Sequence, residues 1–294
     1  MARIVKITAI VGLLALCGSA WAVDSNGLVA HWKLDEGSGG TAYDSANSND
    51  GTLVNGPAWT SGKIGGALGF DGENDYVVVG DDSSLDIAGA ISFSAWIKLN
   101  NVNWQIIISK RGPGGGYPYG GYTFHFQDRA WNTGGAYRLL FTKTNGIAGS
   151  GGGNYGTHTH WDRVASEKDD WQTGVWYHVA ATWDGTTNTD SMKMYIDGQL
   201  DATHTAKQSF ILTNNYDVTI GDILPQLTNP FNGLIDDVRI YERVLSAGEV
   251  EELYLMEMSA HERAIMKLED AAGKKQAALE TIEEALDEEW DAYG

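Results

Sequence analysis

The nine residues ISFSAWIKL, from Ile91 to Leu99, decide the fold class. Their apolar side chains fall at every second position, namely Ile91, Phe93, Ala95, Ile97 and Leu99. Successive side chains of a β-strand point to opposite faces, so this alternation is typical of a strand that buries one face in a core. The sequence therefore predicts a β-sheet here.

Similar strand patterns recur as far as residue 246, separated by turns rich in glycine, asparagine and aspartate. They cover residues 28–34, 76–79, 105–111, 122–126, 136–143, 175–184, 192–199, 217–222 and 233–241. Residues 105–111, QIIISKR, form an unbroken apolar run that we expect to be buried on both faces. Asp-Gly pairs at 71–72 and 197–198 predict tight turns. This spacing of short strands, with few helical patterns, predicts an all-β, two-sheet antiparallel sandwich.

The first residues have the pattern of an export signal. A basic start precedes an apolar run at residues 7–17, and Ala20-Trp21-Ala22 matches a signal peptidase site. We therefore expect residues 1–22 to be removed and the protein to be secreted to the periplasm, the cell surface or the medium. The apolar run is too short to span a membrane, so we expect no membrane span in the mature chain.

Cys17 is the only cysteine, and it lies within the expected signal. A lipid anchor at Cys17 is the weaker interpretation, because the bulky Leu16 stands where a small residue is needed. The mature chain then has no disulfide, although export would take it to a place where disulfides form. Other interactions must fix its loops, and a metal ion is one candidate.

The chain is acidic, with 39 Asp and Glu against 20 Lys and Arg and a formal net charge of −19. This charge argues against nucleic acid and anionic membrane surfaces as partners. It favours cations, and calcium is a cation that carboxylate and carbonyl oxygens bind. Many exported proteins are simply acidic, which is the alternative explanation.

The pattern changes to a helical one after residue 246. Ser246 and Glu249 have the spacing of a capping box, and Leu253 and Met256 can pack back on the sandwich. We expect the sandwich to cover residues 23–255 and an acidic amphipathic helical tail to cover 256–294. Polar residues interrupt one of the two heptad seams of this tail. The heptad pattern thus leaves two interpretations of the tail open. It forms a homo-oligomer or binds a partner, or it lies on its own domain.

Several separated motifs occur in an order that resembles a known family. They are GLVAHWKLDEG, GFDGENDYVVVG, ISFSAWIKL, GVWYHVAATWDG and GLIDDVRIYERVLS. Together they resemble the concanavalin A-like, laminin G-type jelly roll of bacterial exported proteins over residues 26–254. The resemblance implies two antiparallel sheets, one of them concave, and often a bound calcium. Its members include sugar-binding modules, adhesion domains and accessory domains of hydrolases, so the fold does not fix the activity.

Two adjacent carboxylates, Asp236 and Asp237, stand in the last strand pattern. The stretch IDDVRIY also resembles the last core strand of laminarinase-type hydrolases, where the Asp two places before Val-Arg binds a structural calcium; the match here is Asp236. Because neighbours in a strand point to opposite faces, we expect Asp236 between the sheets. Asp237 then faces outward or pairs with Arg239.

Calcium takes six to eight oxygen ligands, often including backbone carbonyls. We expect Asp35 and the carbonyl of Gly72 to join Asp236, with Asp44 and Asp75 as secondary candidates. Such an ion would tie an N-terminal loop to the final strand. The alternative is that backbone amides or an ion pair hold Asp236.

Two glycine-rich loops, residues 112–121 and 145–161, carry aromatic residues that suit a sugar-binding face. Sugars stack their C–H faces on aromatic rings and pair their hydroxyls with polar side chains. The predicted ligand-binding residues are Tyr117, Tyr119, Tyr122, His125, Trp131, Asn132, Arg138, Tyr155 and Trp161. The alternative is that these aromatics pin the loops to the sheet, as we expect of the strand tryptophans Trp32, Trp96, Trp176 and Trp183.

We find no catalytic signature. The Glu-x-Asp-x-x-Glu strand of hydrolases that share this fold is absent, and no Ser-His-Asp or phosphate-loop pattern occurs. His158, His160 and Asp162 have the H-x-H-x-D spacing of a transition-metal site, but in a glycine-rich loop exposed polar side chains are the favoured interpretation. The sequence thus predicts a non-catalytic module for a glycan or extracellular protein. A surface-assembly protein comes second and a glycoside hydrolase third.

Overall fold

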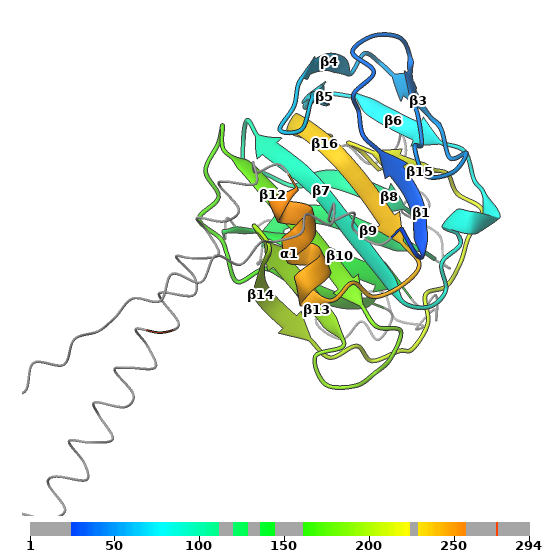
Figure 1. The fold of residues 1–294 in the computed structure, drawn as a ribbon, viewed down its shortest axis with the longest axis vertical. Coiled ribbons are helices and arrows are strands. Elements are labelled where there is room, and N and C mark those ends of the chain that lie inside the picture. The colour runs from blue at the N-terminus through cyan, green and yellow to red at the C-terminus, as the bar shows by residue number, and fades with distance from the viewer. Residues whose placement is uncertain are drawn as a thin grey trace, which may run out of the picture.

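Two antiparallel β-sheets packed face to face make up the body of the protein (Figure 1). The computed structural model describes residues 25–111, 120–128, 136–144, 161–223, 229–256 and 275. The predicted all-β sandwich with a helix after residue 246 is confirmed. The predicted signal, residues 1–22, lies outside the described residues, as does the predicted tail beyond Met256 apart from residue 275.

Sheet A has the strand order β14-β13-β12-β7-β16-β5-β4, and β1 also pairs with β16. Its strands are β1 (Leu28–Trp32), β4 (Ala58–Ser61), β5 (Gly66–Asp71), β7 (Ile91–Leu99), β12 (Trp176–Trp183), β13 (Met192–Ile196), β14 (Gln199–His204) and β16 (Asn232–Tyr241).

Sheet B has the order β11-β10-β9-β8-β15-β6-β3-β2. Its strands are β2 (Thr41–Ala42), β3 (Gly51–Val54), β6 (Tyr76–Val79), β8 (Gln105–Lys110), β9 (Tyr122–Asp128), β10 (Tyr137–Thr144), β11 (Trp161–Ala165) and β15 (Val218–Ile220). A short 3₁₀ helix, η1 (Ser83–Leu85), follows β6.

The hydrophobic core fills the space between the sheets. The five alternating residues of β7 that we singled out all lie in it, and every residue of β8 is buried, as its unbroken apolar run predicts. Phe93 of sheet A packs against the rings of Phe124 and Phe141 of sheet B. Each such aromatic side chain contributes roughly 1.5–3 kcal/mol by leaving water, so these contacts hold the two sheets together.

The two Asp-Gly pairs make different turns. Asp197 and Gly198 have φ values of 50° and 78° and join β13 to β14 in a hairpin, as expected of a primed turn. Asp71-Gly72 instead lies between β5 of sheet A and β6 of sheet B, so the chain changes sheet there. Whether the chain stays in one sheet or crosses to the other depends on which distant strands β5 and β6 pair with, and the Asp-Gly dipeptide alone does not indicate it.

Buried lysines fix a long loop that no disulfide could hold. Lys143 Nζ lies 3.0 Å from Asp162 and donates to the carbonyl of Gln208 at 2.7 Å, while it sits 4.0 Å from the centre of the Trp183 ring. Lys110, equally buried, contacts Asp81 at 2.5 Å. These ion pairs join the loop after β14 and the η1 region to sheet B.

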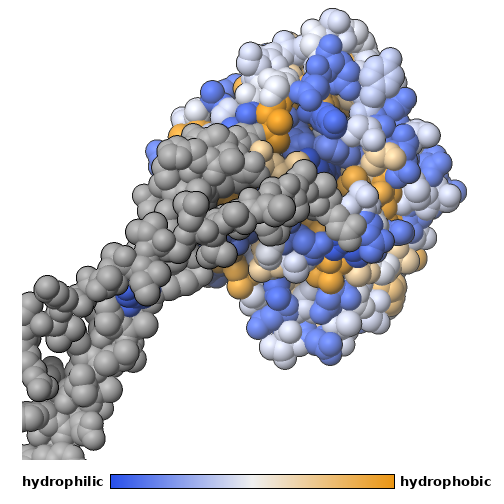
Figure 2. Space-filling model, viewed as in Figure 1, coloured by the Kyte–Doolittle hydropathy of each residue, from blue (hydrophilic) through white to orange (hydrophobic). Residues whose placement is uncertain are grey.

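The helix α1 (Ala247–Leu255) lies on the outer face of sheet A (Figure 1). The predicted capping box of Ser246 and Glu249 is present, and the predicted contact of Leu253 with the sandwich is confirmed. The ring of Tyr254 stacks on Trp96 at 5.7 Å between centroids. In Figure 2 hydrophobic residues appear on this side as small separate areas among hydrophilic ones.

No helix within the described ranges has the length and apolar character that a membrane crossing requires.

Candidate functional site

The two adjacent aspartates of β16 lie on the same face, and our expectation of opposite faces is wrong. Asp236 pairs with Trp96, whose side chain is on the outer face of sheet A, so Asp236 is not between the sheets. A bulge between Asp236 and Arg239, with a φ of 52° at Asp237, turns the next carboxylate to that outer face too. A bulge adds one residue and so breaks the alternation locally.

Asp237 joins two basic side chains in a buried ion network. Its Oδ1 lies 2.6 Å from His31 Nε2, and its Oδ2 accepts a hydrogen bond from Arg239 Nη1. This confirms the predicted pair with Arg239. Burial alone would raise the pKa of Asp237, but the His31 bond and the Arg239 charge hold that pKa below its usual value. The network ties β1 to β16 and forms the floor of a hollow of about 440 Å³.

The predicted calcium ligands do not converge on one point. Asp236 Oδ2 accepts hydrogen bonds from the backbone amides of Lys63 and Ile64, both at 2.8 Å. Asp35 Oδ1 accepts one from Gly66 at 2.6 Å, in the same β4–β5 turn.

The other three predicted ligands lie elsewhere. Asp44 accepts from the backbone amide of His31 at 2.8 Å, which fixes the loop after β2. Asp75 accepts from the backbone amide of Asp71, and Gly72 packs on the side chain of Asn232. Among the described residues no three His, Cys, Asp or Glu side chains gather in a way that could hold a metal. The arrangement fits the alternative in which backbone amides hold the carboxylates, and calcium binding stays a prediction.

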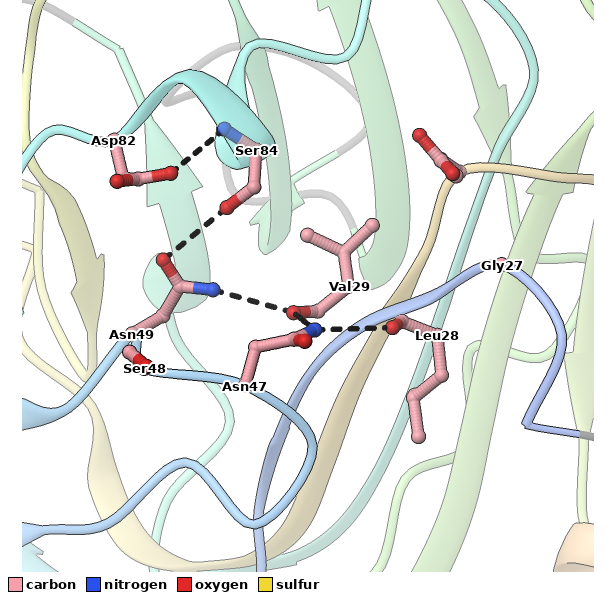
Figure 3. A pocket seen from close by; sticks show the side chains of 9 residues that line it. Gly27, Leu28, Val29, Asn47, Ser48, Asn49, Asp82 and Ser84 are labelled. Atoms are coloured by element: carbon pink, nitrogen blue, oxygen red, sulfur yellow. Dashed lines mark hydrogen bonds between the residues drawn. The ribbon is translucent and has the colours of Figure 1, made fainter.

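A polar hollow of about 480 Å³ lies between the start of β1 and η1 (Figure 3). Asn47 Nδ2 donates to the carbonyl of Val29 at 2.8 Å, Asn49 Nδ2 donates to the same carbonyl at 3.2 Å, and Ser84 Oγ donates to Asn49 Oδ1. These hydrogen bonds connect the walls of the hollow to one another. The two asparagines therefore have a structural role, because they hold their loop against β1 and η1.

The outer face of sheet B carries the strongest candidate site. Register places Thr123, His125 and Gln127 of β9 on this face, because Tyr122, Phe124 and Phe126 point into the core. His125 is 7% exposed and Gln127 is 3% exposed. The outer face of a sheet normally faces water, so buried polar side chains there are unusual.

Two of these buried polar atoms have no hydrogen-bond partner among the described residues: His125 Nδ1 and Gln127 Nε2. His125 Nε2 lies 3.4 Å from Gln127 Oε1. Burial, with the nearby charges of Arg111 and Arg163, lowers the pKa of His125 to about 4, so its ring is neutral at pH 7. An unsatisfied buried polar atom costs about 1–3 kcal/mol, which a ligand or water would recover.

At one end of this face, two arginines meet a single indole ring. Trp161 begins β11, and Arg163 lies two residues on and therefore on the same face. The guanidinium carbons of Arg111 and Arg163 lie 5.1 Å and 5.6 Å from the centre of the Trp161 ring. We call Arg111, Arg163, Trp161 and His125 the arginine cluster.

The nine predicted ligand-binding residues lie in different surroundings, and five of them lie outside the described residues. His125 and Trp161 come together in the arginine cluster. Tyr122 is a correction: its ring lies in the core against Phe93 and its hydroxyl donates to the carbonyl of Leu85, so it cannot meet a ligand at the surface. The remaining loop residues, Tyr117, Tyr119, Trp131, Asn132 and Tyr155, lie outside the described residues.

Arg138 lies on the same face but is held by its own domain. Its Nη1 donates to the carbonyl of Ser166 at 2.6 Å, and its guanidinium lies within 3.6 Å of Glu167 and 3.4 Å of Asp169. Asp162 of the H-x-H-x-D spacing points to the core side, where its carboxylate accepts a hydrogen bond from Lys143 Nζ at 3.0 Å. His158 and His160 of that motif lie outside the described residues.

Sequence reasoning missed Arg111, Arg163 and Gln127. A signal for Arg163 was present, because WDRVA alternates Trp161 and Arg163 on one face of a strand. Gln127 likewise follows His125 at the same period. Arg111 had no local signal, since two strands separate β8 from β11.

The model of one protein family matches residues 71–251, more than half of the chain, and it describes the concanavalin A-like lectin/glucanases superfamily. The chain belongs to this superfamily. The resemblance noted in the sequence is thereby confirmed. A search of curated proteins gave no match.

Several solved structures share the fold at low sequence identity. Domain 4 of AbnA, a GH43 extracellular arabinanase from Geobacillus stearothermophilus solved with arabinotriose, is 23% identical, with a TM-score of 0.54 over 77% of this chain and 98% of that domain. The binding domain of botulinum neurotoxin serotype G is 17% identical, with a TM-score of 0.53 over 79% of this chain and 51% of that one.

Trypanosoma rangeli sialidase in complex with sialic acid is 15% identical, with a TM-score of 0.54 over 81% of this chain and 34% of that one. The chain thus spans about half of the neurotoxin domain and about a third of the sialidase. At these identities the likenesses show the fold.

Proposed function

We propose that the protein is an exported, non-catalytic binding module that recognises a glycan with the outer face of sheet B. The observation that carries this proposal is the pair of buried, unpartnered polar atoms on that face, His125 Nδ1 and Gln127 Nε2. One side chain offers an acceptor and the other a donor, which is what the hydroxyl groups of a sugar require.

The comparisons support the proposal in a limited way. A domain of nearly the same extent, from the GH43 arabinanase, was solved in complex with arabinotriose. That domain shares the sandwich and its length, so a whole module of this size is sufficient to hold a short saccharide. A non-catalytic role is supported by the sequence, which lacks the Glu-x-Asp-x-x-Glu strand of the hydrolases that share this fold.

A glycan array probed with the chain from Val23 tests the proposal. Trp161→Ala is the test variant, and Trp176→Ala is its matched control, because Trp176 is also partly buried at the start of a strand but belongs to sheet A. Binding to one glycan class should persist in the control and fall at least about tenfold in the test variant. Binding that survives Trp161→Ala, or no binding to any glycan, would overturn the proposal; melting curves of both variants establish that they fold.

Assembly through the C-terminal tail is the second candidate function. Tyr254 stacks on Trp96, and Gly198 comes so close to Tyr254 that a Cβ there would lie 3.0 Å from its ring. The last described turn is thus fixed to sheet A, and whatever follows starts from a rigid anchor. Light scattering on the full chain and on a chain ending at Leu255 tests it: a larger mass for the full chain supports assembly, and equal monomer masses refute it.

A further inference from the structure

We propose that the hollow of about 440 Å³ on the outer face of sheet A is a second binding site, which takes a small organic acid with one carboxylate and an apolar body. We call it the β1–β16 hollow, and its floor consists of His31, Asp237, Arg239 and Tyr241. It lies on the opposite side of the sandwich from the proposed glycan face, so this inference does not rest on the proposed function.

Strand register gathers the four polar side chains of the floor. His31 of β1 pairs with Arg239 of β16, and Tyr241 lies two residues on from Arg239 and therefore on the same face. The bulge in β16 turns Asp237 to this face as well. Figure 1 shows β1 and β16 side by side, with α1 on the same side of the sheet. Two distant parts of the chain thus supply one floor.

In this floor two bases share one carboxylate. Asp237 accepts hydrogen bonds from Arg239 Nη1 and from His31 Nε2, which lies 2.6 Å from its Oδ1. A guanidinium has five N–H donors, and Asp237 is the one hydrogen-bond partner of Arg239 among the described residues. The Arg239 side chain is only 6% exposed, so an acceptor placed in the hollow is what its remaining N–H groups can reach.

The hydroxyl of Tyr241 is a second donor that needs an acceptor. Tyr241 is 1% exposed, and its hydroxyl makes no hydrogen bond with any of the described residues. Burial raises the pKa of Tyr241, and the charges of Arg239 and Asp237 also act on it, so the hydroxyl lies near both. An oxygen of a ligand in the hollow would satisfy this hydroxyl. The planar guanidinium and the hydroxyl together match the two oxygens of a carboxylate.

The charge balance of the hollow differs from that of the whole chain. The residues that line it include three bases, His31, Lys33 and Arg239, and two acids, Asp35 and Asp237. In the whole chain 39 Asp and Glu outnumber 20 Lys and Arg and 7 His. Lys33 is exposed, whereas the Asp35 carboxylate already accepts a hydrogen bond within the β4–β5 turn. A local excess of bases attracts an anion.

Apolar side chains complete the lining of the β1–β16 hollow. Leu28 and Ile64 are half-buried, and Met256 at the end of α1 is 41% exposed. An inorganic anion would leave these side chains in water, whereas the apolar body of an organic acid would cover them. The volume is that of a site for a small molecule. The hollow therefore fits a carboxylate that is attached to an apolar body.

Three matched probes test the inference: 4-methylpentanoate, its amide 4-methylpentanamide, and acetate. The amide keeps the apolar body without the charge, and acetate keeps the charge without most of that body. Isothermal titration calorimetry of the chain from Val23 should show that 4-methylpentanoate binds at least about tenfold more tightly than either. Its affinity should fall as NaCl rises from about 50 to about 500 mM, because salt screens charge pairs.

Tyr241→Phe is the test variant, because it removes one hydroxyl that holds no other described residue. It should weaken the binding of 4-methylpentanoate about tenfold. Tyr195→Phe is the matched control and should leave the affinity unchanged. Tyr195 is also buried on the outer face of sheet A, but β12 and β7 lie between its strand and β16. Melting curves of both variants establish that they fold.

Arginine side-chain NMR locates the bound acid. The Nε–H signal of Arg239, assigned by its loss in Arg239→Lys, should shift in proportion to saturation with 4-methylpentanoate. Equal affinities for the acid and its amide, or for the acid and acetate, would overturn the ligand class. Binding that Tyr241→Phe does not weaken and that leaves the Arg239 signal unmoved would overturn the site, as would no binding of the acid at about 10 mM. The glycan array decides the proposed function separately, because none of these probes is a glycan.

Discussion

Replacing Asp237 by Asn should destabilise the fold strongly although the side chain hardly changes shape. Asp237 is 3% exposed and Arg239 is 5% exposed, and the two form a hydrogen-bonded ion pair. The substitution leaves the Arg239 guanidinium buried without its counter-charge, which costs about 3–5 kcal/mol. At about 2–4 °C per kcal/mol for a domain of this size, the melting temperature should fall by roughly 6–20 °C.

Urea unfolding at pH 7 measures the effect, followed by the tryptophan fluorescence of wild type, Asp237→Asn, Arg239→Met and the double variant. Each single variant leaves one buried charge, whereas the double variant leaves none. The double variant should therefore lose at least about 1 kcal/mol less than the two single losses added together. Glu251→Gln, an exposed carboxylate on α1, is the control and should change stability by less than about 0.5 kcal/mol. An Asp237→Asn loss under 1 kcal/mol, or strict additivity, would refute the reasoning.

Three further predictions concern protonation and metal. Burial raises the pKa of Asp222 to about 6, above its unfolded value, so the stability linked to its neutral form is present below about pH 4 and lost as the pH rises through 6. Asp222→Asn should thus stabilise the protein by up to about 3 kcal/mol at pH 7.5 but not at pH 4 in urea unfolding, and equal effects at both pH values would contradict this. Burial lowers the pKa of His178 to about 3, so its contribution is complete above about pH 6.5 and is lost as the pH falls towards 3. His178→Gln should reduce the slope of unfolding free energy against pH near pH 5 by about 1.4 kcal/mol per pH unit, and an unchanged slope would count against it. If the predicted calcium is bound at Asp236, excess chelator should lower the melting temperature of the wild type in calorimetry and leave that of Asp236→Asn unchanged; a wild-type melt that chelator does not shift would count against the ion.

Periodicity in the sequence was sufficient for the architecture, because burial of alternate residues is a local property of a strand. The alternating residues of β7 lie in the core, and the residues of β8 are all buried, as the two patterns predicted. The sheet change at Asp71-Gly72 and the bulge at Asp237 did not follow from local pattern. Both depend on which distant strand each segment pairs with. The bulge leaves one trace in the sequence, because the core residues Ile235 and Val238 lie three positions apart instead of two or four.

The candidate site was predicted only in part, for the same reason. His125 and Trp161 were chosen as polar and aromatic residues of glycine-rich surroundings, and they do lie near one another through Arg111 and Arg163. Tyr122 was chosen by the same rule and is wrong, although its alternation with Phe124 and Phe126 already indicated the core face. Arg111 reaches Trp161 only because β8, β9, β10 and β11 are neighbours in sheet B.

Side-chain arginine NMR is the most direct test of the binding face. Spectra of the guanidinium Nε–H groups would be recorded while the glycan that binds on the array is added. The signals of Arg111 and Arg163, assigned as those lost in Arg111→Gln and Arg163→Gln, should shift in proportion to saturation, while that of Arg239, buried with Asp237, stays fixed. Binding that leaves the Arg111 and Arg163 signals unmoved would contradict a glycan site on the outer face of sheet B.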